Sequence, residues 1–308
     1  MKLGVIVNPT AGSGSARRRL PEILAALERA GLEGRVFETK GPGHARELLG
    51  QARELGLECV AVVGGDGTLN EVAQAYLGSD GQPVPGPDLA LIPSGTGGDF
   101  RRTFGLGTSI DEAVTRLAQS PPRPVDLGIV ELTAPDGQRV VRSFLNITSF
   151  GLGGLTDRLV SQSPKFLGGK ATFLLGAVRG ILAYRNAPVR IRIDGQVRLE
   201  APILNVALAN GKYFGGGMKV APEADPSDGL LDVVAMVDLT RAQGIALAQH
   251  IYRGSHVGRP GVSLERGAVV EAEPLVPGAE VLIDLDGETP GRLPLRARLA
   301  KGAVNIRV

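Results

Sequence analysis

One glycine-rich turn, Gly64-Gly65-Asp66-Gly67-Thr68, has residue types and spacing that could do chemistry. Its three glycines remove side chains, so that another backbone or a ligand can come close. The N–H groups and the positive end of a following helix favour an anion. Asp66 would repel a bare phosphate unless a cation lay between them. The turn therefore predicts a phosphate bound together with Mg²⁺. The alternative is a strand-to-helix turn in which Asp66 only acts as a cap.

The elements on either side of this turn are predicted from their apolar patterns. The run Cys59–Val63 is continuous and apolar, which indicates a buried strand. Apolar residues from Leu69 to Leu77 recur on one face of a helix. Thr68 and Glu71 stand at capping-box spacing, so we expect this helix to begin at Thr68.

Three other loops follow short apolar strands in the same half of the chain. They are Asn8–Ser15 after the strand 3–7, Thr39 at the end of the strand 35–39, and Pro93–Asp99 after the strand 89–92. Amphipathic helices alternate with these strands, and Pro21 suggests where the regular part of the first helix begins. Such alternation predicts an α/β domain with a doubly wound, Rossmann-like parallel sheet. Ligands bind beyond the carboxyl ends of the strands in such sheets, where all four loops would meet.

The second half of the chain has a different pattern of apolar residues. After the proline-rich stretch 121–124 come alternating runs with hairpin signals, including 128–132, 140–147, 189–193, 203–209, 231–237, 269–272, 281–285, 293–299 and 303–308. Helical intervals are expected only near 155–161, 171–184 and 240–252. This pattern favours a mostly antiparallel β-sandwich or split barrel with a few helices. We therefore expect domains at 1–128 and 129–308, while the last strand could return to the first domain.

Composition excludes several classes of protein. The net charge of +2 is too small to imply nucleic acid, and 4% aromatic residues give no stacking platform for single strands. One cysteine, Cys59, rules out an internal disulfide and fits a reducing compartment. No apolar run reaches the roughly 18 residues that span a bilayer. We expect a cytoplasmic protein, with peripheral contact at the inner membrane face left open.

Common catalytic motifs are missing. The P-loop pattern is absent because Gly169-Lys170 and Gly211-Lys212 are not followed by Ser or Thr. The first strand is not followed by a G-x-G-x-x-G fingerprint. Clusters of the H-x-E, C-x-x-C or H-E-x-x-H type do not occur, so a histidine triad or a zinc enzyme is not favoured. Glycine loops and carboxylates remain.

The glycine loops of the first half and two Asp-Gly segments of the second half, taken in order, resemble the diacylglycerol kinase catalytic-domain superfamily. They are most similar to the bacterial soluble lipid kinases of the YegS and DgkB type. The glycine turn with Asn70-Glu71 is similar to the signature of that superfamily. Pro93–Phe100 resembles the P-x-G-T-x-N-D-[FL]-A-R loop of its lipid kinases, which NAD kinases lack. Ala221–Asp232 resembles the A-P-x-A-x-x-x-D-G-x-L-D segment, and Asp286-Gly287-Glu288 the late D-G-E. The matching motifs cover nearly the whole chain.

Two residues depart from the pattern of the second loop. Gly98 stands where the family usually has Asn, and Arg101 where it usually has Ala. The loss of Asn removes side-chain hydrogen bonds that could order the loop, whose role would pass to backbone groups. Arg101 and Arg102 add cations near the expected nucleotide rim.

The resemblance implies that the first domain binds ATP and Mg²⁺. The residues that it assigns to ATP are Asn8, Thr39, Gly64, Gly65, Asp66, Gly67, Thr68, Leu69, Asn70 and Thr96. It implies that Asp66 holds the catalytic Mg²⁺ through water, supported by Asp99 or Asp126. The late glutamate, Glu288, would be the general base that takes the proton from the acceptor hydroxyl.

A second, structural Mg²⁺ is implied by the resemblance at Asp225, Asp228 and the backbone of Leu230. From the residues alone, an Asp-Pro-Ser-Asp-Gly turn without a metal is the favoured interpretation of this segment. The stretch Lys165–Lys170 and the helix after it mix apolar and basic residues, which suits docking on anionic lipid or an ordinary solvated helix edge.

The leading functional hypothesis is an ATP- and Mg²⁺-dependent lipid kinase whose acceptor is diacylglycerol or a related lipid alcohol. Two alternatives stay open: a kinase for a soluble acceptor such as NAD, and a regulator that binds nucleotide or lipid without catalysis. The second glycine loop argues against NAD. Asp66 and Glu288 argue against loss of catalysis, whereas Gly98 keeps that alternative open. The expected partners are ATP, the lipid alcohol and a peripheral membrane surface, with a homodimer as an open option and no nucleic acid.

Overall fold

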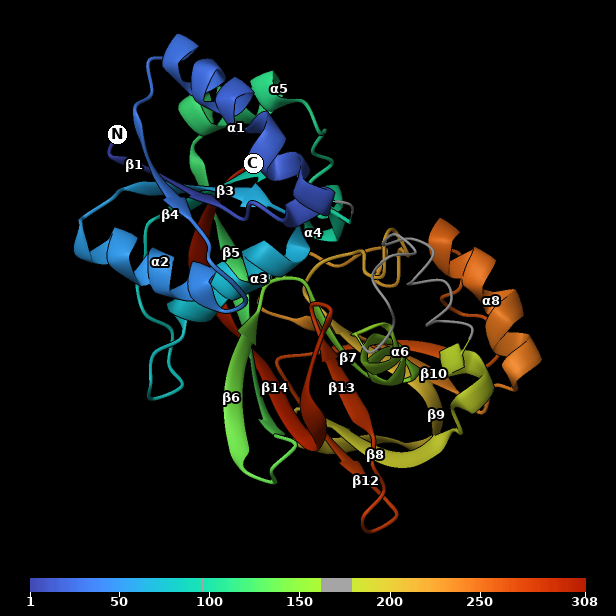
Figure 1. Cartoon of the computed structure of the whole chain (residues 1–308). Coiled ribbons are helices and arrows are strands. Elements are labelled where there is room, and N and C mark those ends of the chain that lie inside the picture. Colours follow the sequence, from blue (N-terminus) through green and yellow to red (C-terminus); the bar gives the residue numbers. More distant parts are fainter. Residues whose placement is uncertain (96, 162–178) are drawn as a thin grey trace. The chain divides into compact units, whose positions relative to one another are not determined.

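A computed structural model of the chain describes residues 1–95, 97–161 and 179–308. These residues form two compact units (Figure 1). Unit 1 comprises Met1–Leu127, Pro226–Asp228 and Ala300–Val308, and unit 2 comprises Gly128–Asp225 and Gly229–Leu299. Both chain termini therefore belong to unit 1, because the end of the last strand returns to it.

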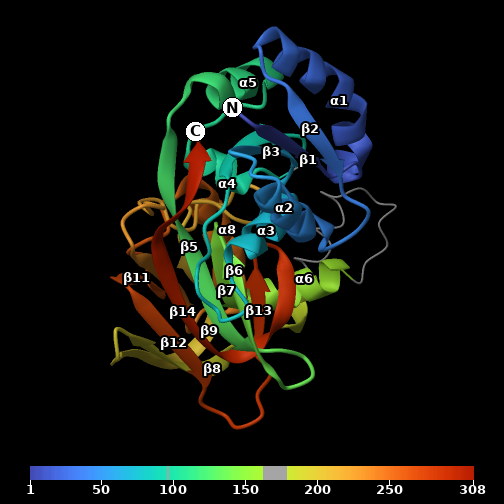
Figure 2. The same ribbon diagram turned by 90° about the vertical axis from the view of Figure 1, so that its left-hand side faces the viewer.

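Unit 1 is built on parallel strands. Its elements are β1 (Leu3–Val7), α1 (Ala11–Arg29), β2 (Gly34–Glu38), α2 (His44–Glu54), β3 (Cys59–Gly64), α3 (Asp66–Ala73), the 3₁₀ turn η1 (Gln74–Tyr76), β4 (Asp88–Pro93), α4 (Asp99–Thr103) and α5 (Ile110–Gln119). The strands pair in the order β2-β1-β3-β4, and the end of β14 (Glu288–Arg307) adds a further parallel strand beside β4. Helices α1 and α5 lie on one side of these strands, and α2 and α3 on the other (Figures 1 and 2).

The core of unit 1 explains this layering. Side chains from β1, β3 and β4 pack against α1 and α5, with Val5, Ala61 and Ile23 among the fully buried residues. Because both faces of the strands are covered, their sequences read as continuous apolar runs. The registers align Val7 with Val63 and Gly64 with Pro93, so β1, β3 and β4 end at one edge.

Two predicted helix starts in unit 1 are wrong. Helix α3 begins at Asp66 rather than Thr68, with Gly65 in an extended conformation before it. Helix α1 includes Pro21 in its interior, after a kink at residues 12–14 with left-handed backbone. Packing of one face of α1 into the core outweighs the hydrogen bond that Pro21 cannot donate. In α5, by contrast, a side chain at the N-cap does the capping: Ser109 accepts the N–H of Glu112 at 3.4 Å.

Unit 2 is mostly antiparallel β-structure. Its elements are β5 (Pro122–Thr133, which starts in unit 1), β6 (Arg139–Phe144), β7 (Ile147–Gly151), α6 (Leu152–Ser161), β8 (Ala187–Ile193), β9 (Gln196–Ala209), β10 (Leu231–Val237), α8 (Arg241–Arg253), β11 (Val262–Gly267), β12 (Val269–Pro274), β13 (Leu282–Leu285) and the first part of β14. Residues 179–183 are also helical. The predicted interval 171–184 otherwise lies outside the described residues.

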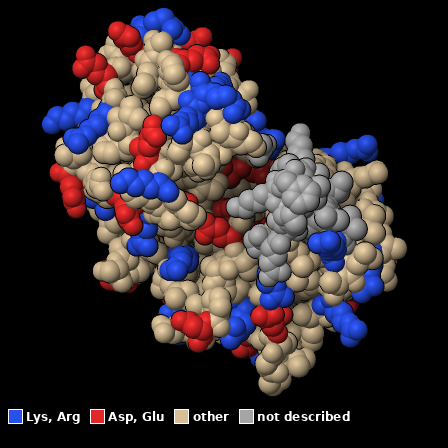
Figure 3. Space-filling view, viewed as in Figure 1, with Lys and Arg blue, Asp and Glu red and all other residues tan. Residues whose placement is uncertain are grey.

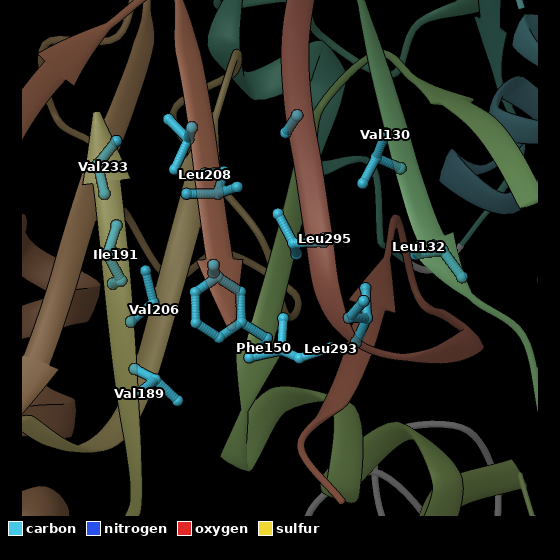
Figure 4. Close-up of a cluster of buried hydrophobic side chains, with 14 of the residues drawn as sticks. Val130, Leu132, Phe150, Val189, Ile191, Val206, Leu208, Val233, Leu293 and Leu295 are labelled. Carbon is cyan, nitrogen blue, oxygen red and sulfur yellow. The ribbon is translucent and has the colours of Figure 1, made fainter. Parts of the chain in front are cut away.

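Two long strands, β9 and β14, connect the other strands of unit 2. Strand β9 pairs with β7, β8 and β10, and β14 pairs with β5, β12 and β13. Figure 4 shows Phe150, Leu208 and Leu295, from β7, β9 and β14, in the same apolar cluster. The expectation of two domains, the second rich in antiparallel strands, is confirmed.

The strand predictions in unit 2 differ from the structure in several places. Strands β5 and β9 begin at Pro122 and Gln196, ahead of the predicted starts at 128 and 203. The predicted run 140–147 is broken into β6 and β7, because Leu145 and Asn146 turn away from the ladder. The two runs at 293–299 and 303–308 are one continuous strand, β14. Strand β11 was not predicted, and its burial does not alternate, because only its end residues Val262 and Gly267 are buried.

Candidate active site

Asp66 caps a helix, but not the one it begins. Its Oδ2 accepts the backbone N–H groups of Gly98 at 2.7 Å and Asp99 at 3.0 Å, and its Oδ1 accepts that of Phe100 at 3.1 Å. These donors form the start of α4, whose orphan N–H groups need acceptors. The carboxylate thus joins the first glycine turn to the second glycine loop.

Thr68 and Glu71 do not form the predicted capping box. The Thr68 hydroxyl accepts the side-chain amide of Asn8 at 3.1 Å, and Glu71 Oε2 accepts the N–H of Ala45 at 3.2 Å. The backbone N–H of Asn8 donates to Val63 O, also at 3.1 Å. Tertiary partners have therefore taken the groups that a capping box would use, and they hold the first loop against the glycine turn.

The glycines of the turn have different neighbours. A Cβ on Gly95 would lie 2.5 Å from the Cα of Gly65, so the two loops touch backbone to backbone. A Cβ on Gly64 would meet the Thr68 side chain at 2.6 Å. A Cβ on Gly67 would meet nothing within 4 Å, and Gly67 is exposed. Within the turn, Gly67 is thus the glycine next to open space.

The other residues predicted to bind ATP lie at or behind the same edge. Thr39 follows β2, and its N–H donates to Val7 O at 2.9 Å. Leu69 and Asn70 are buried in α3, where the Asn70 side chain accepts from Gln74. They can support the turn from behind. Thr96 lies outside the described residues.

Two further carboxylates were expected near Asp66. Asp99 is buried, its N–H donates to Asp66, and its carboxylate pairs with Arg102. Asp126 is fully buried and accepts the N–H of Gly302 at 2.7 Å. Asp99 is therefore joined directly to the Asp66 cap, whereas Asp126 anchors the end of β14.

In unit 2, Glu288 is presented by a two-residue hairpin between β13 and β14. Leu285 pairs with Glu288, and the turn residues Asp286 and Gly287 have φ angles of 47° and 89°. Both are left-handed, which matches the hairpin turn that Asp-Gly favours. Glu288 is exposed at the start of β14. The hairpin therefore places the expected base on a rigid strand end.

Two aspartates fasten this hairpin. Asp286 accepts the N–H groups of Ile147 at 2.8 Å, Leu145 at 3.1 Å and Asn146 at 3.4 Å, where β6 gives way to β7. Burial raises the pKa of Asp286 to about 7, and the donated N–H bonds oppose that shift. Asp284 accepts the N–H of Gly287 at 2.8 Å.

Asp284 also faces a third carboxyl group. The pKa of Asp284 is raised well above its usual range. Burial is the main cause, and the charge of the neighbouring Asp157 is the second. Burial raises the pKa of Asp157 as well. The two neighbouring carboxyls therefore disfavour being charged at the same time, and the Ser149 hydroxyl donates to Asp284 at 3.1 Å.

Sequence reasoning did not find this support. Asp157 stands in no motif. The only signal for Asp284 was its place two residues before Asp286 of the D-G-E motif.

The segment predicted to hold a structural Mg²⁺ is divided by the unit boundary. Asp225 and Leu230 belong to unit 2, and Asp228 belongs to unit 1. The carbonyl of Asp228 accepts the Lys301 ammonium at 3.3 Å. Within the described ranges, no three Asp, Glu, His or Cys side chains gather as a metal site. The predicted set has only two carboxylates and a carbonyl, so this metal site stays a prediction.

Comparison with known proteins gives the same two-part division. Residues 2–130 match the diacylglycerol kinase catalytic domain, and residues 146–308 match the YegS C-terminal NAD kinase beta sandwich-like domain. A diacylglycerol kinase of Mycobacterium tuberculosis (strain H37Rv) is 29% identical, covering 99% of this chain and 94% of its own. A probable lipid kinase YegS-like of Xanthomonas euvesicatoria pv. vesicatoria (strain 85-10) is 32% identical, with coverages of 92% and 88%.

Among solved structures, a diacylglycerol kinase from Bacillus anthracis str. Sterne has a TM-score of 0.71 and 23% identity, covering 99% of this chain and 96% of its own. At that identity the likeness shows the fold. Together the matches define a two-domain phosphotransferase of the lipid kinase class. The chain belongs to the family of diacylglycerol kinases and YegS-like lipid kinases.

Proposed function

We propose that this chain is an ATP- and Mg²⁺-dependent kinase that phosphorylates the hydroxyl of diacylglycerol or a related lipid alcohol. Family membership along nearly the whole chain carries the lipid kinase class. The nucleotide is assigned to unit 1, whose parallel strands and glycine loops make a Rossmann-like setting for it. The exposed Gly67 lies in the first turn of α3, whose N–H groups lack intrahelical partners and favour phosphate.

Asp66 has the capacity to serve a metal ion through water. A carboxylate has about four acceptor positions, and three N–H groups occupy three of them. The remaining position suits a water molecule bound to Mg²⁺, with Asp99 beside it. When bound, Mg²⁺ would supply positive charge to the ATP phosphates.

The reaction assigned to the remaining groups is a simple transfer. The acceptor oxygen forms a bond to the γ-phosphorus, the bond to the β,γ-bridging oxygen breaks, and ADP leaves. Glu288 takes the proton of the acceptor hydroxyl. The locked hairpin supports this role, because a base must be held in one orientation to be effective.

Transfer of label tests the proposal. The protein is incubated with γ-labelled ATP, Mg²⁺, a panel of lipid alcohols including diacylglycerol, and NAD. Label in a lipid phosphate is the expected result. Label only in NAD would replace the lipid assignment with a soluble acceptor, and ATP binding without transfer to any acceptor would identify a regulator.

We also propose peripheral contact with anionic membranes. None of the described helices is long and apolar enough to cross a membrane. Helix α8 contains no Asp or Glu, carries Arg241 and Arg253, and exposes 57% of Ile245 and 52% of Tyr252. Such a mixture suits a lipid surface. On the face in Figure 3, Lys and Arg are interspersed with Asp and Glu on both units. The segment Lys165–Lys170 lies outside the described residues.

Vesicle sedimentation tests this contact. The protein should co-sediment with vesicles rich in phosphatidylglycerol, and the combined change Ile245→Ser and Tyr252→Ser should reduce the bound fraction. Equal binding of the variant and the unchanged protein would exclude α8 as the contact. A cytoplasmic location, a homodimer and the structural Mg²⁺ at Asp225, Asp228 and Leu230 remain predictions.

A further inference from the structure

The two residues that depart from the family pattern in the second glycine loop touch each other. A Cβ built on Gly98 would lie 2.5 Å from Nε of Arg101, 3.1 Å from its Cδ and 3.3 Å from its Cγ. The Arg101 side chain therefore occupies the space into which any side chain at position 98 would project. Gly98 has a φ angle of 77°, a left-handed conformation that glycine adopts without strain.

The Arg101 side chain is fixed at its far end. Its Nη1 donates to Leu106 O at 2.6 Å, and the N–H of Leu106 donates back to Arg101 O at 3.1 Å. Arg101 is half-buried, so its aliphatic part packs while the guanidinium binds the carbonyl. The Arg101 side chain is therefore bonded at its tip to Leu106, after α4, while its middle part packs against Gly98, before α4.

Gly98 also donates the shortest hydrogen bond that the Asp66 carboxylate accepts from this loop. Of the three N–H groups that Asp66 accepts, that of Gly98 is at the shortest distance, 2.7 Å, with Asp99 and Phe100 following. A glycine has the largest backbone freedom to lose, so a loop that relies on its N–H needs an outside restraint. Arg101 is in contact with Gly98 and supplies that restraint.

We propose that Arg101 is a positioning residue for Asp66, which it holds in place by packing over Gly98. The restraint that an Asn side chain at position 98 would give its own loop comes here from residue 101. The consequence for catalysis rests on the proposed function, because it takes Asp66 as the partner of Mg²⁺. The restraint itself is a property of unit 1 and can be measured without any acceptor.

Three variants separate this role from general stability: Arg101→Ala, Gly98→Asn, and the two changes together. Arg101→Ala should speed deuterium exchange of the peptide that contains the amides of residues 98–100. Gly98→Asn should do the same, because its Cβ displaces Arg101. The combined variant should return towards the exchange of the unchanged protein, because Asn tolerates the left-handed conformation and the shortened side chain at position 101 leaves room for it.

Kinase activity gives the second readout. Arg101→Ala should raise the Mg²⁺ concentration for half-maximal activity about fivefold, as expected for about 1 kcal/mol of lost restraint, and the combined variant should recover most of it. A merely destabilised protein would lower the active fraction without shifting that concentration. Arg29→Ala, which breaks an exposed ion pair with Asp111, is the control and should change neither readout.

Unchanged exchange at residues 98–100 in Arg101→Ala, or additive effects in the combined variant, would overturn the proposal. If Arg101→Ala does not fold, Gly98→Asn, which displaces the Arg101 side chain without removing it, decides by the same exchange measurement. Should the unchanged protein transfer no phosphate, the proposed function fails. The exchange experiment still decides whether Arg101 restrains Gly98.

Discussion

The side-chain amide of Asn8 donates a hydrogen bond to the hydroxyl of Thr68 at 3.1 Å, across a sequence separation of 60 residues. This bond connects the loop after β1 to the glycine turn after β3. Thr68 is buried, so the amide would lose its partner if the hydroxyl were removed. The predicted nucleotide edge is therefore held together by side chains as well as by the sheet.

Thr68→Val keeps the shape of the side chain and removes this acceptor. We expect the free energy of unfolding to fall by about 1 kcal/mol, and ATP to bind more weakly because the first loop is released. Thermal melting and calorimetric titration with ATP measure the two effects. Thr68→Ser keeps the hydroxyl and should behave like the unchanged protein, and a matching loss in that variant would show that the hydrogen bond is not the cause.

The glycines of the two loops allow a matched pair of substitutions. Gly95→Ala should destabilise unit 1, because its Cβ would lie 2.5 Å from the backbone of Gly65. Gly67→Ala should leave the melting temperature equal or slightly higher, since Ala is the better helix former by up to about 1 kcal/mol.

We nevertheless expect Gly67→Ala to weaken ATP binding, because its methyl group would enter the space assigned to phosphate. Thermal melting and ATP titration of both variants check this contrast. Unchanged ATP affinity in Gly67→Ala would show that the phosphates of ATP do not bind at this turn.

The role of Glu288 is tested by replacing its carboxylate with an amide. Glu288→Gln should bind ATP normally and lose turnover by about 100-fold or more, the usual contribution of a general base. Label transfer and ATP titration are the measurements. Glu280→Gln is the control, because Glu280 is an exposed partner of Arg158 at 3.0 Å and should not matter for turnover. Full turnover in Glu288→Gln would assign the base elsewhere.

The Asp157–Asp284 pair predicts how stability depends on pH. The pKa values of both carboxyls are raised in the folded protein, so it retains protons that the unfolded chain has released. Their contribution is full below the usual carboxyl pKa of about 4 and declines as pH rises above it. The melting temperature of unit 2 should therefore fall between pH 5 and pH 8.

Asp157→Asn should reduce that fall, because only one carboxyl of the pair is left to ionise and the charge that raises the pKa of Asp284 is gone. If the free energy of unfolding at pH 8 rises by about 1 kcal/mol, the melting temperature of a unit of this size should rise by about 3 °C. Melting curves at both pH values provide the measurement. Asp136→Asn, in an exposed hairpin turn, should keep the original pH dependence. The same slope in Asp157→Asn would show that the pair is not its source.

The sequence by itself determined the strands of the first half, the loops that follow them and the family. Continuous apolar runs such as Cys59–Val63 predict buried strands because both faces of the sheet are covered, and β3 has the expected start. The motif order from the glycine turn to Glu288 indicated a lipid kinase, as the comparisons confirm. These signals are local, since each depends on residues that are neighbours along the chain.

Only the tertiary structure decided which partner each polar group takes. Asp66 caps α4 and Thr68 binds Asn8, although each had a plausible partner nearer in sequence. It also decided that Ala300–Val308 returns to unit 1. A side chain in the folded protein can reach any group that packing brings within about 3 Å. That proximity depends on how distant segments are stacked, which sequence spacing does not contain.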